Sequence, residues 1–453
     1  MQGIIQWLDK NGYGTIDKSF YSAIELWQKW YKGKTPFHSY KQWNGVEHTT
    51  QTRKTLNMAK KLSEDWANML LNEKVEIVTG DEASQNRLND ILDANGFYVR
   101  GNQLVELTMA LGTGAFVEFM DGDKVNIDYV RANMIYPLAT ENGEILDCAF
   151  ASEHKVKKDS FVYLNIHERN EQGNYVIKNI YFKRTNDTLQ ETELPEGVVP
   201  EINTGSPVPR FQIIKPNIVN NVELDNPMGI SVYANSIDQL EALDLVYDSY
   251  ANEFKLGKKR IIVPIKFARI MESQDGTMTY PVFDSNDTEF YAVTETDGQD
   301  KIVEMNMEIR ADAHEQGLKT GLNILAKKCG LGDSYYRFET TGVKTATEVV
   351  SEESDLYRNL KKHEIVLNEA LRKMVIAIGD MDGFNIDPAK ITINFDDSII
   401  EDTGAEKEKF LQEIRDGIRD KWEYRARFFG ETEEEAKANV PQAESNVDWF
   451  NEE

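Results

Sequence analysis

The sequence is poor in cysteine, in long apolar runs and in positive charge, and each shortage excludes a class of protein. Its 453 residues include only two cysteines, Cys148 and Cys329, too few for a disulfide framework and too far apart for a zinc site. It has no apolar run of the ~18 residues that a membrane-spanning helix needs. The first residues lack the charged and apolar regions of a secretory signal. We therefore expect synthesis in a reducing, intracellular compartment.

Acidic residues outnumber basic ones, 77 Asp and Glu against 51 Lys and Arg, for a net charge of −26. This balance argues against a protein that grips nucleic acid and reads its sequence, because such proteins carry a basic face. The acidic residues are dispersed and are densest over 431–435 and 448–453. They serve solubility, or they form a surface that faces DNA without holding it. Charge alone does not separate these interpretations.

Catalytic motifs are also missing. The chain contains neither the phosphate-binding pattern GxxxxGK[ST] nor a GxSxG elbow, and its six histidines do not show ligand spacing. Gly112-Thr113-Gly114 precedes strand-like residues rather than a helix and predicts a turn. We therefore expect a protein that is not an enzyme and that has no cofactor and no bound metal.

Two acidic segments match metal-binding patterns only in part. Residues 9–20 resemble a calcium loop, but Tyr13 and Phe20 stand where ligands are required, so the segment is interpreted as a helix start. After the strand-like residues 391–395 come four carboxylates that could hold metals for phosphoryl chemistry or could form an ordinary turn. They are Asp396, Asp397, Glu401 and Asp402.

Hydrophobic periodicity predicts an α+β chain. Amphipathic helices are expected over 18–32, 52–72, 84–95 and 97–113, with a short strand at 75–78. Alternating residues and Asn-Gly or Asp-Gly turns predict antiparallel strands over 115–119, 124–129, 145–152, 160–168 and 175–183. The polar, proline-punctuated stretch 186–209 is expected to be a loop.

The second half of the chain predicts unusually long helices over 229–258, 310–329 and 345–378, with a β-rich insert at 261–307. At 1.5 Å per residue the first and last would span about 40 and 50 Å. The apolar stripe of the first helix comprises Ile237, Leu240, Leu243, Tyr247, Tyr250 and Phe254, with Asp244 and Asp248 outside it. Such a stripe packs on the core of the same chain or on a neighbouring subunit.

The loop 331–344 joins two of these helices and carries Tyr335, Tyr336, Arg337 and Lys344. Aromatic and cationic side chains can contact a nucleic-acid backbone without reading its sequence. The other interpretation is a surface loop that its aromatic residues hold on the core. The residues alone favour this second interpretation.

Several stretches, taken in order, resemble the portal proteins of tailed bacteriophages, in the lineage typical of phages of Gram-positive bacteria. They are NPMGISVYAN (226–235), DLVYDS (244–249), NEFKLGKKR (252–260), KTATEVVS (344–351), NFDDSII (394–400) and FGETEEEA (429–436). The resemblance covers about residues 15–440. It implies a portal-protein fold with an α/β wing, long stem helices, a small α/β clip and an α-helical crown.

The resemblance also implies a function and a division of the chain. Portal proteins form rings, usually of ~12 subunits, at one capsid vertex, around a tunnel for double-stranded DNA. The implied parts are wing 1–228 and 345–400, stem 229–258 and 309–330, clip 259–308, tunnel loop 331–344, crown 401–440 and an acidic, disordered tail 441–453. The clip would dock the terminase large subunit and a head–tail adaptor through Lys258, Lys259, Arg260, Asp284 and Asp287.

The implied partners also include the major capsid and scaffold proteins, and the implied location is the virion after synthesis in the host cytoplasm. Two alternatives remain open on the residues. One is a metal-dependent phosphodiesterase built on the carboxylates at 396–402. The other is a structural adaptor that binds partners without forming a ring.

Overall fold

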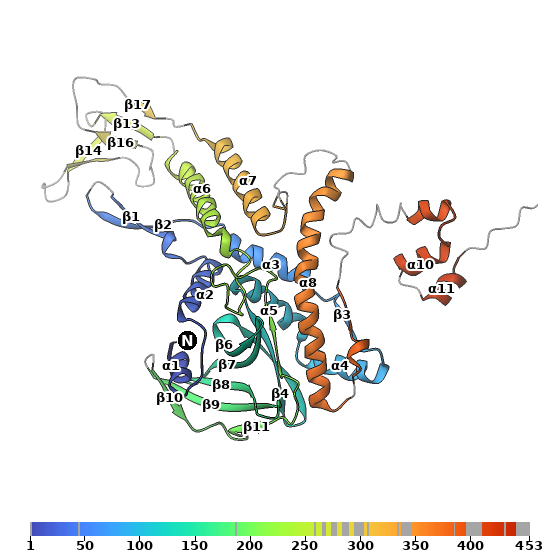
Figure 1. Cartoon of the computed structure of the whole chain (residues 1–453). Coiled ribbons are helices and arrows are strands. Elements are labelled where there is room, and N and C mark those ends of the chain that lie inside the picture. The colour runs from blue at the N-terminus through green and yellow to red at the C-terminus, as the bar shows by residue number, and fades with distance from the viewer. Residues whose placement is uncertain are drawn as a thin grey trace, which may run out of the picture. The chain divides into compact units, whose positions relative to one another are not determined.

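The structure is a computed structural model that describes residues 2–43, 46–185, 188–257, 260–264, 269–272, 279–282, 290–293, 303–305, 308–332, 335–336, 346–384, 386–395, 410–429 and 432–440. The chain forms two compact units, Met1–Phe395 and Asp396–Glu453. The first unit contains both helices and mostly antiparallel sheets, in largely separate stretches of the chain, which makes it an α+β unit (Figure 1).

Five helices begin the first unit: α1 (Gln2–Lys10), α2 (Lys18–Tyr31), α3 (Met58–Leu70), α4 (Glu82–Ala94) and α5 (Phe97–Leu111). The segment that resembles a calcium loop starts a helix, as predicted, because the Asp17 carboxylate accepts the Ser19 N–H at 2.8 Å and caps α2. The helix predicted from residue 52 begins later. Asn57 adopts a left-handed conformation with φ 53°, which a helix interior does not tolerate.

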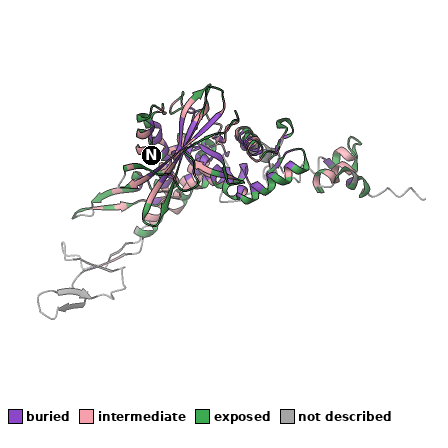
Figure 2. Ribbon diagram, turned by 90° about the horizontal axis from the view of Figure 1, so that it is seen from below, coloured by how far each residue is buried: buried purple, intermediate pink, exposed green. Residues whose placement is uncertain are grey.

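Two antiparallel sheets follow. The strands are β4 (Gly114–Asp121), β5 (Lys124–Arg131), β6 (Ile135–Glu141), β7 (Glu144–Val156), β8 (Asp159–Arg169), β9 (Tyr175–Thr185), β10 (Thr188–Thr192), β11 (Glu201–Asn203) and β12 (Phe211–Ile214). One sheet has the order β10-β9-β8-β7-β6 with β11 on β9, and the other has the order β12-β4-β5. The predicted antiparallel region is confirmed, but the expected loop 186–209 contains β10 and β11. Figure 2 shows many buried residues along these strands.

The chain crosses itself closely where it leaves the sheets. A Cβ on Gly229 would lie 2.3 Å from the carbonyl oxygen of Gly112, which ends α5 with φ +89°. The Gly229 N–H donates to the Thr113 hydroxyl at 3.0 Å, and the Val232 N–H donates to the Met109 carbonyl at 3.0 Å. These bonds replace helical ones, so the predicted helix start at residue 229 is wrong.

Three helices dominate the rest of the first unit. They are α6 (Ile237–Leu256), α7 (Ala311–Lys328) and α8 (Ala346–Asp382). With 20 residues α6 spans about 30 Å rather than 40 Å, whereas the 37 residues of α8 span about 55 Å. The helix predicted over 345–378 continues past Gly379 to Asp382. A Cβ there would lie 3.1 Å from the Phe384 carbonyl oxygen, so the small residue lets the returning chain pack on the helix.

Short strands complete this unit. The insert between α6 and α7 contains β13 (Arg260–Pro264), β14 (Arg269–Glu272), β15 (Thr279–Val282), β16 (Phe290–Val293) and β17 (Val303–Met305), as its predicted β-rich character requires. Far from it in sequence, β18 (Thr392–Asn394) pairs antiparallel with β3 (Glu76–Val78). Both strands were predicted, and only the tertiary structure pairs them.

The second unit is helical where the structure describes it. Residues 410–415 are helical, followed by α10 (Lys421–Phe429) and α11 (Glu433–Ala438). The Phe410 ring packs edge-on against Phe428 with centroids 5.4 Å apart. A capping box starts α11, because Thr432 and Glu435 each accept the other's main-chain N–H.

The core of the first unit holds ionisable side chains in their neutral forms. Glu118 on β4 is fully buried, and desolvation raises its pKa to about 8. His167 on β8 and His363 on α8 are also buried, and desolvation lowers their pKa to about 3 and about 4. Each group therefore resists ionising more strongly in the folded chain than in the unfolded chain.

These three groups place the stability maximum near pH 6.5. Below the ordinary histidine value of 6.5 the unfolded chain binds protons that the buried histidines exclude, so stability falls with falling pH. Between 4.5 and about 8 the folded chain keeps the Glu118 proton that the unfolded chain releases, so this contribution falls as pH rises, by about 1.4 kcal/mol per pH unit. The two histidines outweigh the single glutamate below 6.5. Urea unfolding at several pH values measures the profile.

A matched pair of substitutions isolates the glutamate. Glu118→Gln removes the titrating proton, so we expect its stability to change little from pH 6.5 to about 8, where the native chain loses about 2 kcal/mol. Glu141→Gln, at an exposed position on β6, should retain the native profile. A Glu118→Gln chain that still weakens across this interval would show that other groups cause the decrease.

Candidate functional site

The helices α6 and α7 pack tightly through two glycines one turn apart on α7. A Cβ on Gly321 would lie 2.9 Å from the Leu243 Cδ1 atom, and a Cβ on Gly317 would lie 3.3 Å from the Val246 Cγ1 atom. Leu243 is 1% exposed and fills this contact inside one chain. A groove of about 500 Å³ runs along the pair, lined by uncharged residues only: Ala242, Leu243, Val246, Ala313, Gln316, Gly317, Thr320, Gly321 and Ile324.

An ion pair joins the other ends of these helices. The Arg310 guanidinium donates to both carboxylate oxygens of Glu253, at 2.8 and 3.0 Å, which lowers the pKa of Glu253 to about 2. Beside it the Tyr250 ring lies edge-on to Phe254, with centroids 5.0 Å apart. The two helices are therefore held together by the glycine contacts along their length and by the Glu253–Arg310 ion pair near the β-rich insert.

The predicted stripe of α6 is used largely within the chain. Leu240 and Leu243 are buried, and Ile237, Tyr247 and Tyr250 are half-buried. Phe254 is 47% exposed, and two residues outside the predicted set, Leu245 and Ile324, are each 48% exposed. The exposed apolar surface of the helix pair thus differs in part from the stripe that periodicity indicated.

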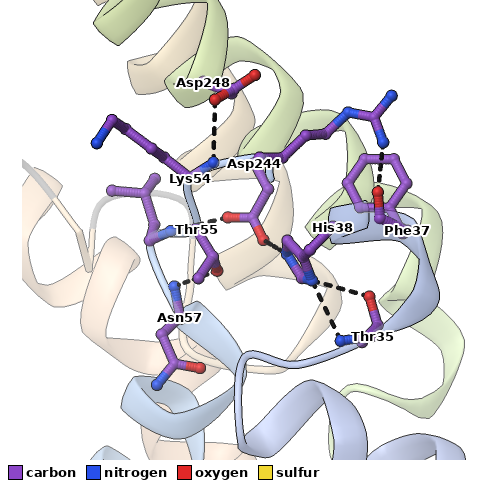
Figure 3. A network of polar contacts seen from close by, with 10 residues as sticks. Thr35, Phe37, His38, Lys54, Thr55, Asn57, Asp244 and Asp248 are labelled. Atoms are coloured by element: carbon purple, nitrogen blue, oxygen red, sulfur yellow. Dashed lines mark hydrogen bonds and ion pairs between the residues drawn. The ribbon is translucent and has the colours of Figure 1, made fainter. Parts of the chain in front are cut away.

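The opposite side of α6 carries a buried polar network (Figure 3). Asp244 and Asp248, placed outside the apolar stripe by the sequence, are only 4% and 7% exposed. The Asp244 carboxylate lies 2.9 Å from Nε2 of His38 and accepts the Leu56 N–H at 2.8 Å, while Asp248 accepts the Lys54 N–H at 3.0 Å. Three hydrogen bonds thereby tie residues 38–56 to α6.

The histidine of this network has a defined tautomer. Its Nδ1 accepts the Thr35 main-chain N–H at 3.3 Å, so in the neutral ring the proton is on Nε2 and is donated to Asp244. Sequence reasoning missed this site. The acidic residues four apart on one helix face were the available signal, but nothing in the sequence connects them to a histidine 206 positions away.

The network anchors a hairpin formed by β1 (Ser39–Trp43) and β2 (His48–Thr52). At its base the Arg53 N–H donates to the His38 carbonyl at 2.8 Å. The Arg53 guanidinium lies 4.5 Å from the Phe37 ring centroid and 4.3 Å from that of Tyr40. The hairpin was not predicted, although Asn44-Gly45 between β-forming residues is a strong hairpin signal.

The start of the predicted tunnel loop is anchored on the core. The Tyr336 hydroxyl donates to the Asp65 carboxylate at 2.7 Å, and burial together with this carboxylate raises the pKa of Tyr336. Tyr335 is 37% exposed, and its ring lies edge-on to that of Tyr336. One tyrosine of the predicted set therefore holds the loop, and the other lies at the surface.

Most other predicted site residues lie outside the described residues: Arg337, Lys344, Lys258, Lys259, Asp284, Asp287, Asp396, Asp397, Glu401 and Asp402. Arg260 begins β13. Among the residues that the structure describes, no three His, Cys, Asp or Glu side chains gather as a metal site would require. Within the same ranges, no helix combines the length and apolar character needed to cross a membrane.

Comparison with known proteins identifies the family of the chain. The family model described as "Phage portal protein, SPP1 Gp6-like" matches residues 13–446. No curated protein matches the chain. The matched range includes every described element from α2 to α11, nearly the whole chain. The chain therefore belongs to the SPP1 Gp6-like family of phage portal proteins.

Proposed function

We propose that the chain is the subunit of a portal ring at one vertex of a tailed-phage capsid, through which double-stranded DNA is packaged and ejected. Membership of the family supports this role. The ring would contain ~12 copies related by cyclic symmetry. The protein is structural, and the ATPase that drives packaging is a different protein. It is made in the host cytoplasm and resides in the virion.

The uncharged α6–α7 groove is the observation that supports ring formation. The chain has a net charge of −26, so copies repel one another wherever acidic surfaces meet. An interface between copies needs a surface without charge, because buried unpaired charges oppose association. The groove offers such a surface, its lining residue Ile324 is 48% exposed, and Leu245 adds an exposed apolar side chain on α6.

The other parts of the chain take their proposed roles from the family. The wing comprises 1–228 and 345–400, the stem contains α6 and α7, the clip is 259–308 and the crown is 401–440. The clip, through the residues given above, docks the terminase large subunit and the head–tail adaptor, and the ring also contacts capsid and scaffold proteins. In the tunnel loop, Tyr335, Arg337 and Lys344 face DNA, while Tyr336 anchors the loop on Asp65.

Charges placed in the groove should prevent ring formation. We expect Ala313→Glu with Thr320→Glu to change a species of about 620 kDa, a ring of ~12 copies, into a 51.9 kDa monomer. Both positions are exposed in the single chain, so the substitutions should leave its folding intact. Native mass spectrometry measures the assembly, and circular dichroism measures the fold.

Lys255→Glu is the matched control, because it lowers the net charge by the same amount at an exposed position outside the groove. This variant should still form rings. Intact rings from the double variant would contradict the groove as the contact. Leu243→Asp is a poor test of the ring, because Leu243 is buried within its own chain and its loss would unfold the helix pair.

A further inference from the structure

The β1–β2 hairpin projects from the first unit without partners for its strands among the described residues. Its strands pair with each other, from Ser39 opposite Thr52 to Trp43 opposite His48, and no other described strand joins them. None of its described side chains is buried, and Trp43 is 56% exposed. An isolated two-stranded hairpin is marginally stable in water, so this one gains from a surface to lie against.

The base of the hairpin is rigid although its strands are exposed. Both of its ends are held by the buried network on α6, through His38 before β1 and through the Lys54 and Leu56 main chain after β2. The direction in which the hairpin extends from its contact with α6 is therefore fixed. A preorganised arm loses less entropy on docking than a mobile segment would.

The hairpin is also nearly free of charge. Over residues 39–52 the charged side chains are Lys41 and Glu47, which cancel, whereas the whole chain carries −26. Serine, threonine, glutamine and aromatic residues make up most of the rest. Electrostatic repulsion thus opposes the approach of this arm to another acidic copy less than it opposes most of the surface.

The hairpin base and the uncharged groove occupy opposite sides of α6. Successive helix residues are about 100° apart, so Asp244 and Asp248 point about 200° away from Ala242 and Val246. The first two residues hold the hairpin, and the last two line the groove with α7. In Figure 1 the hairpin leaves α6 on the side away from α7.

This placement satisfies the geometry of a head-to-tail ring, in which a projection on one face meets a complementary recess on the other. We propose that the β1–β2 hairpin of one copy lies against the α6–α7 groove of the neighbouring copy, with Trp43 packed on the groove. Small side chains, among them Ala242, Ala313 and Thr320, line the groove, and an aromatic anchor on an uncharged surface is a favourable contact. The inference rests on the proposed ring.

Mixing two variants that each carry one added cysteine tests this contact. Trp43→Cys protein and Thr320→Cys protein are purified separately, mixed, assembled and oxidised, so any disulfide between positions 43 and 320 must join two copies. The native Cys148 and Cys329 are buried and stay in place. Val99→Cys, at a 67% exposed position on α5, replaces Trp43→Cys in the control mixture. Peptide mass spectrometry identifies the linked positions.

We expect the 43–320 link in the ring fraction of the first mixture and no 99–320 link in the control. In addition, Trp43→Ala should leave the melting temperature of the single chain unchanged but raise about tenfold the concentration at which half of the rings dissociate.

The arm contact would be overturned, and the ring retained, by two results together. Rings of the mixed variants would form without a 43–320 link, and rings of Trp43→Ala protein would dissociate at the native concentration. A disulfide that joins position 43 of the Trp43→Cys protein only to a capsid or tail protein, in assembled particles, would also overturn the arm contact in favour of a different partner. Failure of the native chain to form any ring would overturn the proposed function itself.

Discussion

Gly229→Ala is expected to destabilise the chain by at least about 3 kcal/mol and to prevent folding if the chain is only marginally stable. The added Cβ would lie 2.3 Å from the Gly112 carbonyl oxygen and 2.8 Å from the Lys215 Cβ atom. The nearest atom belongs to the backbone at the end of α5 and cannot rotate away, so the two segments must separate. Their separation would also break the bond from the Gly229 N–H to Thr113.

Gly14→Ala is the control for this substitution, because a Cβ at residue 14 meets nothing within 4 Å. Its stability should stay within about 0.5 kcal/mol of the native value. Urea unfolding of the two variants gives the comparison. Equal midpoints would mean that the chain crossing at Gly112 is not a tight packing contact. Because this crossing determines where α6 begins, its loss should also abolish rings.

Asp244→Ala is expected to cost about 3–5 kcal/mol, because it leaves a buried histidine and a partly buried main-chain N–H without their acceptor. Both His38 and Leu56 N depend on this one carboxylate, at 2.9 and 2.8 Å. The loss should be greatest around the hairpin base. Hydrogen exchange over residues 38–56 should therefore accelerate more than exchange in the sheets, and urea unfolding should report the total loss.

Two variants separate the effect of losing the buried hydrogen bonds from the effect of losing a negative charge. Asp244→Asn retains an oxygen that accepts one hydrogen bond, so its loss should be smaller than that of Asp244→Ala. Asp238→Ala removes an exposed carboxylate from the first turn of the same helix and should cost less than about 1 kcal/mol. If the substitutions at 244 and 238 cost the same, the buried network contributes no more than a surface charge.

Features that depend on neighbouring residues were predictable. Apolar spacing placed α2, α4, α5 and α7 within a few residues, and alternation with Asn-Gly and Asp-Gly turns predicted the strands β4, β5 and β7–β9. The Thr432–Glu435 capping box marked the start of α11. In each case the side chains that decide the structure lie within one helical turn or one hairpin of each other, so their spacing in the sequence carries the information.

The candidate site was only partly predictable. Periodicity identified the apolar stripe on α6. It could not tell which stripe residues pack on α7 of the same chain and which line an open groove, because the packing depends on Gly317 and Gly321 of another helix. The beginning of α6 was predicted too early. The main-chain N–H groups of Gly229 and Val232 donate to Thr113 and to the Met109 carbonyl, at the end of α5, and not to carbonyls of a helix that starts at residue 229. The burial of Asp244 and Asp248 likewise requires His38 and the Lys54 and Leu56 main chain.

The sequence by itself determined the α+β class, the long second-half helices with a β-rich insert, and a resemblance to portal proteins that the family match confirms. Only the tertiary structure decided which apolar residues of α6 remain open, where the chain crosses itself, and that a neutral hairpin is fixed on the side of α6 opposite its uncharged groove. The physical reason is the separation in sequence of the residues that interact. Helix and strand formation follow from local spacing, whereas burial and buried polar pairing depend on residues that are brought together from distant parts of the chain.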